Sequence, residues 1–284
     1  MAIFYNQATL SYRGLTTTSN TTVGEITAAI SAVKTALTET YSAGDNITYA
    51  IGLVNNDPVN QTGLTVTDNL GAYAIGTTSA VPLRYVDGSV KYFVNGVLTT
   101  PPTVTTGTNL VFRGLNIPAG GSAVLIYETT VTNAAPLGEG GAITNTAVIS
   151  GNRLTKGVST SETIYATEES NLSIIKSLSP LTVSENGTLT YTFVIQNFGN
   201  TEATVADNVI VTDTFNPILS GISVTYNGAA WTSPANYTYN EATGLFSTIP
   251  GQITVPAATF TQNPATGEIT VTPGISTLTV TGTI

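Results

Sequence analysis

The chain has 284 residues and a formal net charge of −9 at pH 7, and only 9 % of its residues are charged. This acidic balance argues against nucleic acid and anionic membranes as partners. The chain contains no cysteine and no histidine, which excludes disulfide bonds, thiolate metal ligands and the commonest general base. Its richness in Thr, Val, Gly, Asn and Tyr predicts an all-β fold, and its length predicts about two domains.

The first predicted element is a strand within residues 1–13, and it resembles a strand in the middle of the chain. FYNQATLS (4–11) aligns with ITNTAVIS (143–150), so that Asn6 matches Asn145, and both segments alternate with the period of a β-strand. One face of the first segment carries the four residues that we assign to assembly: Phe4, Asn6, Ala8 and Leu10. Because the second copy ends a domain and the first precedes one, we expect residues 1–13 to be a donor strand for another copy of the chain. The alternatives are a tail packed on its own first domain and a disordered terminus.

Two polar segments and two runs of short strands divide the rest of the chain. Residues 14–26 and 153–170 are predicted linkers, because they are rich in polar and turn-forming residues. Many short strands separated by Asn, Asp, Pro and Gly turns predict Ig-like β-sandwiches over 27–152 and 171–284. The predicted fold class is therefore all-β, with two tandem Ig-like β-sandwich domains preceded by an N-terminal donor strand.

The two predicted domains repeat one pattern. Four pairs of residues keep the same order in both: Lys34 and Lys176, Tyr49 and Tyr191, Asn55 and Asn197, Asp68 and Asp213. The first three pairs have the same separation along the chain, and a three-residue insertion precedes the fourth. Matching motifs in matching order indicate an internal duplication. We find no counterpart of the strand at 142–150 in the second domain, which is therefore expected to lack its closing strand.

Three polar residues lie on strand faces that are otherwise apolar: Lys34, Asp68 and Asn145. A lone buried charge is costly, so we expect these side chains to lie together. Burial lowers the pKa of an amine and raises that of a carboxylic acid. A neutral lysine can attack a carboxamide while a protonated Asp polarises its carbonyl group. The sequence therefore predicts an intramolecular Lys34–Asn145 isopeptide bond promoted by Asp68; the alternative is a buried Lys–Asp pair with a hydrogen-bonded Asn.

The second domain has the lysine and the acid of this trio, Lys176 and Asp213, but no strand that carries the Asn. Asn6 of a neighbouring copy would supply it. We therefore expect an intermolecular crosslink between Lys176 and Asn6, with Asp213 as the promoting acid. Such a contact joins different surfaces of successive copies, so it generates a head-to-tail homopolymer.

The motifs that carry the repeat also carry a resemblance. They read SIIKSLSPLTVSENGTLTYTFVIQNFGN (173–200), NVIVTDTF (208–215) and AITNTAVIS (142–150). This pattern resembles the Ig-like "domain of unknown function eleven" or conserved-repeat family of bacterial surface and fibre proteins, here in a two-repeat form with an N-terminal donor strand. The resemblance implies a structural, non-enzymatic protein outside the cell or on the cell or spore surface. The N-terminus shows no signal peptide and the sequence no wall anchor, so the export route is not predicted.

The sequence thus favours a structural subunit of a self-assembling extracellular filament, without enzymatic activity, cofactor, metal site or membrane insertion. The alternative is a monomeric surface adhesin or carbohydrate-binding module. Trp231, Tyr237 and Tyr239 are the candidate aromatic platform for a sugar. Turn acids such as Asp45 and Asp87 have the oxygen ligands that calcium prefers, but their spacing is more typical of turns.

Overall fold

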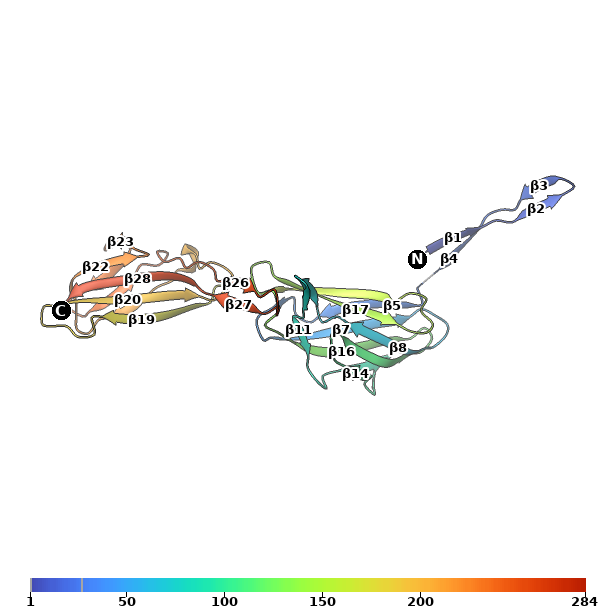
Figure 1. The fold of residues 1–284 in the computed structure, drawn as a ribbon, viewed down its shortest axis with the longest axis horizontal. Coiled ribbons are helices and arrows are strands. Elements are labelled where there is room, and N and C mark those ends of the chain that lie inside the picture. The colour runs from blue at the N-terminus through green and yellow to red at the C-terminus, as the bar shows by residue number, and fades with distance from the viewer. Residues whose placement is uncertain (1, 27) are drawn as a thin grey trace. The chain divides into compact units, whose positions relative to one another are not determined.

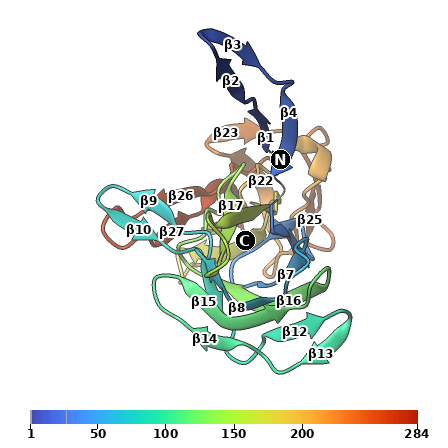
Figure 2. The same ribbon diagram turned by 90° about the vertical axis from the view of Figure 1, so that its right-hand side faces the viewer.

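The computed structural model describes residues 2–26 and 28–284, which form strands, connecting loops and one short 3-10 helix, Val205–Asp207 (Figures 1 and 2). The fold class is all-β, as predicted. The chain divides into two compact units, each described below by itself. The first unit comprises Met1–Tyr73, Val81–Thr132 and Ile143–Ile164. The second unit comprises Ala74–Ala80, Asn133–Ala142 and Tyr165–Ile284.

The first unit is built around a sandwich of two six-stranded sheets. One sheet has the order β13-β12-β16-β7-β5, with β11 also pairing with β16. Its strands are β13 (Val97–Thr99), β12 (Lys91–Val94), β16 (Ser122–Val131), β7 (Asn46–Asn55), β5 (Ile30–Ala36) and β11 (Leu83–Tyr85). The other sheet has the order β14-β15-β8-β17-β18-β6. Its strands are β14 (Thr103–Thr105), β15 (Leu110–Ile117), β8 (Gln61–Asp68), β17 (Ala142–Ser150), β18 (Val158–Ala166) and β6 (Thr40–Tyr41).

The core of this sandwich follows from the alternation along its strands. Every second residue of β7 is buried, and so is every second residue of β16 beside it. Successive side chains of a strand point to opposite faces, so the apolar half of each strand meets the other sheet. Tyr49 and Tyr127 face each other across the β7–β16 pair, and their stacked rings have centroids 5.8 Å apart.

The second unit repeats the first sheet but only part of the second. Its five-stranded sheet has the order β19-β20-β28-β22-β23. These strands are β19 (Leu172–Ser179), β20 (Thr188–Asn197), β28 (Gly274–Thr283), β22 (Ser220–Tyr226) and β23 (Ala229–Trp231). The facing sheet has only three strands, β21 (Thr212–Thr214), β25 (Leu245–Thr248) and β24 (Tyr237–Asn240). Two short hairpins complete the unit: β9 (Tyr73–Ile75) with β10 (Thr78–Ala80), and β26 (Thr259–Gln262) with β27 (Ile269–Thr272).

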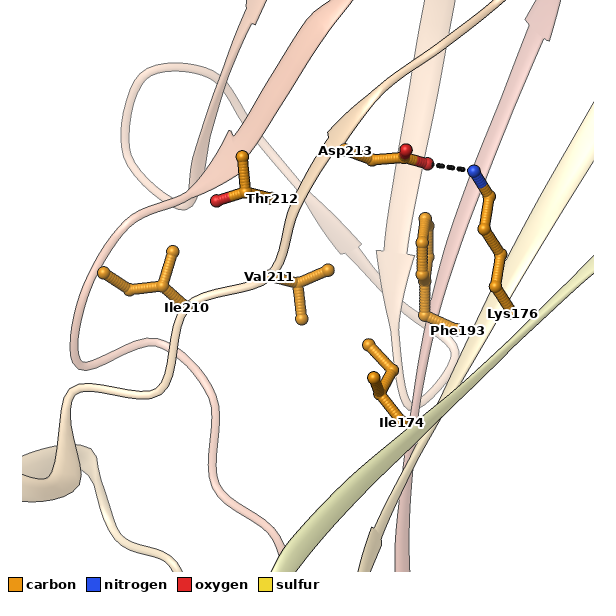
Figure 3. A pocket seen from close by; sticks show the side chains of 7 residues that line it. All are labelled: Ile174, Lys176, Phe193, Ile210, Val211, Thr212 and Asp213. Atoms are coloured by element: carbon orange, nitrogen blue, oxygen red, sulfur yellow. Dashed lines mark hydrogen bonds and ion pairs between the residues drawn. The ribbon is translucent and has the colours of Figure 1, made fainter.

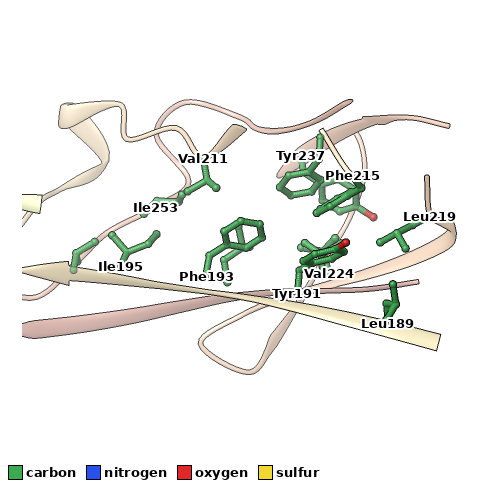
Figure 4. Close-up of a cluster of buried hydrophobic side chains, with 14 of the residues drawn as sticks. Leu189, Tyr191, Phe193, Ile195, Val211, Phe215, Leu219, Val224, Tyr237 and Ile253 are labelled. Atoms are coloured by element: carbon green, nitrogen blue, oxygen red, sulfur yellow. The ribbon is translucent and has the colours of Figure 1, made fainter. Parts of the chain in front are cut away.

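The core of the second unit lies between β20 and the facing segments. Figure 4 shows Tyr191 and Phe193 of β20 pointing toward Val211, Phe215 and Tyr237. The rings of Tyr191 and Phe215 stack with centroids 4.8 Å apart. The second unit therefore has an aromatic core of its own, although its facing sheet is smaller than that of the first unit.

Both segments that the sequence predicted as linkers contain strands. Residues 14–26 contain β3 (Leu15–Thr18) and β4 (Thr22–Ile26), which pair with β2 (Thr9–Tyr12) and β1 (Ala2–Asn6) around the Arg13–Gly14 turn. Residues 153–170 contain β18, which belongs to the first sandwich. Both linker predictions are wrong because threonine, although polar, is β-branched and favours strands. We call the hairpin of residues 2–26 the N-terminal arm.

Candidate functional site

The first unit buries an ion pair between its two sheets. Lys34 on β5 donates to the Asp68 carboxylate at the end of β8, with 2.5 Å between Nζ and Oδ2, and neither side chain is exposed to solvent. Burial lowers the pKa of Lys34 to about 8, although the charge and hydrogen bond of Asp68 act in the opposite direction. This lysine is therefore much closer to a neutral amine than an exposed lysine would be.

Two tyrosines form the walls of this site. The Tyr127 hydroxyl donates to Asp68 Oδ2 at 2.5 Å, and Lys34 Nζ lies 4.8 Å from the centre of the Tyr49 ring. Burial raises the pKa of both phenols, so they remain neutral; Tyr127 donates to Asp68, whereas the Tyr49 hydroxyl has no hydrogen-bond partner among the described residues. Sequence reasoning missed Tyr127, because the register of the second sandwich places Val280 at its equivalent position. In the structure Tyr127 pairs across the strands with Tyr49, a neighbour that no sequence motif marks.

Asn145 on β17 completes the cluster. The strand pairs antiparallel with β8, where Ala147 faces Asp68. The Asn145 side chain is fully buried, and its Nδ2 donates a long hydrogen bond of 3.4 Å to the Tyr127 hydroxyl. Its carbonyl oxygen Oδ1 has no hydrogen-bond partner among the described residues. The structure thus brings Lys34, Asp68 and Asn145 into one buried cluster that contains an unpaired carboxamide oxygen.

The second unit holds the equivalent pair in a more exposed setting. Lys176 on β19 forms an ion pair with Asp213 on β21 (Figure 3). Lys176 Nζ lies 4.5 Å from the centre of the Tyr191 ring, as Lys34 lies over Tyr49. However, the side chain of Lys176 is 41 % exposed and that of Asp213 is 17 % exposed. The same chemical groups are therefore present on equivalent strands without the cover that buries them in the first unit.

An open apolar groove runs beside this pair. Lys176 and Asp213 line a cavity of about 320 Å³. A second cavity of about 180 Å³, which shares part of its lining with the first, lies along β19. Both cavities are lined by Ile174, Ile210 and Val211. Ile174 is 53 % exposed and Ile210 is 50 % exposed. We call this feature the β19–β21 groove; it presents apolar side chains between two strand edges.

The first unit shows what fills the equivalent space. There β8 pairs with β15 on one side and β17 on the other, whereas within the described residues β21 pairs only with β25. Next to β17 lies β18, whose Thr160 hydroxyl accepts a 2.9 Å hydrogen bond from the backbone N–H of Lys34. Strands β17 and β18 therefore bury Lys34, and the second unit has no such strands among its described residues.

The four predicted assembly residues lie in the N-terminal arm, and their side chains are exposed: Phe4, Asn6, Ala8 and Leu10. Asn6 faces Thr22 in the β1–β4 pair. Other apolar side chains of the arm are exposed to solvent as well, and Tyr5 is one of them. The arm thus presents apolar surface that no described element covers.

The other candidate sites have structural roles. Trp231 stacks on Tyr226 with ring centroids 4.8 Å apart, and Tyr237 is buried against Phe246. Tyr237 is therefore a core residue, which favours a structural role over the alternative of a sugar platform. Asp45 accepts a hydrogen bond from a nearby backbone N–H within its turn. Across the described ranges, no group of three or more acidic side chains is placed to hold a metal ion. Among the same residues, no helix has the length and hydropathy needed to cross a membrane.

Comparisons with known proteins leave the family open. No protein-family model and no curated protein matches the chain. Among solved structures, it is similar to the pilus backbone RrgB of Streptococcus pneumoniae, at 11 % identity and a TM-score of 0.35, over 86 % of this chain and 55 % of that one. It is also similar to the Bacillus cereus major pilin BcpA, at 14 % identity and a TM-score of 0.36, over 96 % and 73 % of the two chains. A collagen-binding domain from a Staphylococcus aureus adhesin matches 50 % of this chain and 99 % of its own length, at 11 % identity and a TM-score of 0.31. Similarities this weak assign no function to the chain.

Proposed function

We propose that the chain is the structural subunit of a self-assembling surface or extracellular filament. Successive copies join head to tail when the N-terminal strand of one copy enters the β19–β21 groove of the next. The observation that carries this proposal is the contrast between the two units. The space beside Asp68 is filled by a strand that bears Asn145, whereas the equivalent space beside Asp213 is open.

The N-terminal strand has the sequence that this space requires. It matches the strand 143–150, so Phe4 and Ala8 take the places of Ile143 and Ala147, which are buried in the first unit. Adding a strand to an open sheet edge gives affinity through main-chain hydrogen bonds and specificity through alternate side chains. Entry of this strand would cover both the exposed apolar lining of the groove and the unpaired edge of β21. An uncovered edge of this kind otherwise promotes aggregation.

The buried cluster of the first unit supports a covalent step. Transfer of a proton from the Lys34 ammonium to the Asp68 carboxylate gives an amine and a carboxylic acid. The amine attacks Cγ of Asn145, and the acid donates a hydrogen bond to Oδ1, the oxygen that otherwise lacks a donor. Asp68 then carries a proton from the attacking nitrogen to Nδ2, the Cγ–Nδ2 bond breaks, and ammonia leaves. The product is a Lys34–Asn145 isopeptide bond, with Asp68 holding the remaining proton.

The same chemistry at the open site would link subunits. Asn6 of the incoming strand takes the position of Asn145 and reacts with Lys176, while Asp213 carries the protons. The incoming strand also supplies the burial that Lys176 lacks in the separate subunit. Reaction is therefore coupled to assembly, and the filament becomes covalently continuous without any cysteine.

Deletion of residues 2–13 tests the assembly proposal. We expect the shortened chain to keep both folded sandwiches, because neither sandwich core includes this segment, but to remain monomeric. Size-exclusion chromatography with light scattering and electron microscopy measure this against the full-length chain. Filaments of unchanged length from the shortened chain would contradict the proposal.

A further inference from the structure

The N-terminal arm is a two-stranded hairpin. Entry into the groove of another copy can therefore involve its first strand alone or both of its strands. Two antiparallel ladders, with a shift of one residue between them, set its register. Strand β1 pairs with β4, so that Phe4 faces Gly24 and Asn6 faces Thr22. Beyond these pairs, β2 pairs with β3 up to the Arg13–Gly14 turn. The predicted donor strand therefore already has a partner strand within its own chain.

Strands β17 and β18 of the first sandwich form an equivalent pair. Two contacts fix their register: the Ala166 N–H donates to the Gly141 carbonyl oxygen at 2.7 Å, and the hydroxyl oxygens of Thr144 and Thr163 lie 2.8 Å apart. This register places Ile143 opposite Ile164. Both isoleucines are buried in the core of the sandwich.

The two hairpins match over β1 and β4 when their registers are superposed at Phe4 and Ile143. Because Phe4 corresponds to Ile143 in the sequence match, Gly24 corresponds to Ile164. The Phe4 ring lies over Gly24, where an added Cβ would approach Cζ of the ring to 2.3 Å. In the arm, the large Phe4 ring thus lies beside a glycine, whereas the corresponding positions in the first sandwich hold two isoleucines of medium size. The second strand of the arm is adapted to the first, as β18 is adapted to β17.

The strand edges beside the groove favour a pair of strands over a single one. In the first unit, β17 pairs with β8, but it is β18 that reaches β5 through the hydrogen bond from Lys34 N–H to Thr160. In the second unit, the outer edges of β21 and β19 both lack a partner within the described residues. A single strand on β21 would leave the position of β18 empty and Lys176 covered on one side only.

We propose that the whole arm, residues 2–26, inserts as a preformed hairpin into the β19–β21 groove of a second copy of this chain. Strands β1 and β2 lie along β21, and β3 and β4 lie between them and β19. This inference rests on the proposed function. A preformed hairpin loses less conformational freedom on binding than a disordered strand would. It also buries Lys176 from both sides, as β17 and β18 bury Lys34.

The connections in the chain fit this arrangement. Strand β4 ends at Ile26 and β5 begins at Ile30, so only a short segment separates the inserted hairpin from the first sandwich of its own subunit. Strand β18 ends at Ala166 and β19 begins at Leu172, which is a similarly short connection. The joint between subunits thus repeats the connectivity of the joint between the two sandwiches of one subunit.

The Gly24→Ile substitution in the full-length chain tests the inference. The new side chain competes with the Phe4 ring for one position, so covalent polymer formation should slow by about tenfold or more, as expected for overpacking. The double variant Phe4→Ile with Gly24→Ile recreates the Ile143–Ile164 pair and should restore the rate. The matched control is Gly107→Ile, since a Cβ at Gly107 meets no atom within 4 Å and this residue lies outside the arm and the groove.

Hydrogen exchange in assembled filaments gives a second readout. Insertion of the whole hairpin should protect amides of residues 15–26 as strongly as those of residues 2–12. Protection confined to residues 2–12, together with normal assembly of Gly24→Ile, would overturn the hairpin inference and leave single-strand donation standing. If the double variant forms covalent polymer as slowly as Gly24→Ile, the proposed correspondence of the Phe4–Gly24 pair with the Ile143–Ile164 pair is also contradicted. Filaments that form without residues 2–13 would instead remove the proposed function itself.

Discussion

Replacing Asn6 by alanine should convert the boiled, detergent-treated filament from a covalent ladder into monomers. The substitution removes the carboxamide that we propose reacts with Lys176, whereas the apolar residues of the proposed donor strand remain. Filaments should therefore still form under native conditions through strand pairing, but strong denaturant should now separate their subunits. Denaturing electrophoresis beside negative-stain electron microscopy measures both properties.

Asn152→Ala is the matched control for this variant, because Asn152 is an exposed residue in a loop of the first unit. It should give the same ladder as the unmodified chain. A ladder that persists in Asn6→Ala would show that another residue forms the link between subunits. Monomers from the boiled unmodified filament would show that subunits are held by strand pairing alone.

The second large effect is expected from Asp68→Ala. This substitution leaves the fully buried Lys34 amine without its counter-charge and removes the acid that we propose promotes the isopeptide bond. Breaking a buried ion pair costs about 3–5 kcal/mol, so the free energy of unfolding should be lower by roughly that amount than in an unmodified chain whose isopeptide bond has not yet formed. The intact mass should also rise toward the value calculated without loss of ammonia from the first unit. Denaturant unfolding and intact-mass spectrometry measure the two effects.

Asp213→Ala provides the control, since it removes the same type of pair where Lys176 is 41 % exposed. In the unassembled subunit its effect on stability should be only about 0–1 kcal/mol, as for surface ion pairs. An equal loss of stability in both variants would contradict the role that we assign to burial. An Asp68→Ala chain that is still lighter by one ammonia would exclude Asp68 as the promoting acid.

Part of the site was predictable because the internal duplication repeats its charged residues in both halves of the chain. Lys34 and Asp68 have counterparts in Lys176 and Asp213 at corresponding places, and such repetition of charged residues on apolar strand faces is a strong signal. Asn145 was found through its match with Asn6. The structure places the three residues of the first unit in one buried cluster.

The remainder escaped prediction for physical reasons. Tyr127 has no aromatic counterpart in the second unit, so the comparison of repeats passes over it. Strands β3, β4 and β18 consist largely of threonine, serine and other small or polar residues. Linkers are rich in the same residues, so composition alone does not distinguish these strands from linkers. Their strand character comes from pairing with a partner strand, and pairing partners are not visible in a local window of sequence. The second strand of the arm was therefore missed, together with the role that we propose for it.

The most direct test of the central claim is to mix two single variants, Asn6→Ala and Lys176→Ala. The first keeps a reactive groove without a reactive donor strand, and the second keeps a reactive donor strand without a reactive groove. Each variant alone should give only monomers on denaturing electrophoresis, whereas the mixture should give a covalent dimer and nothing longer. Tandem mass spectrometry should locate the link between Asn6 of one variant and Lys176 of the other. A mixture that yields only monomers, or a ladder from either variant alone, would contradict donation of the arm from one copy to the next.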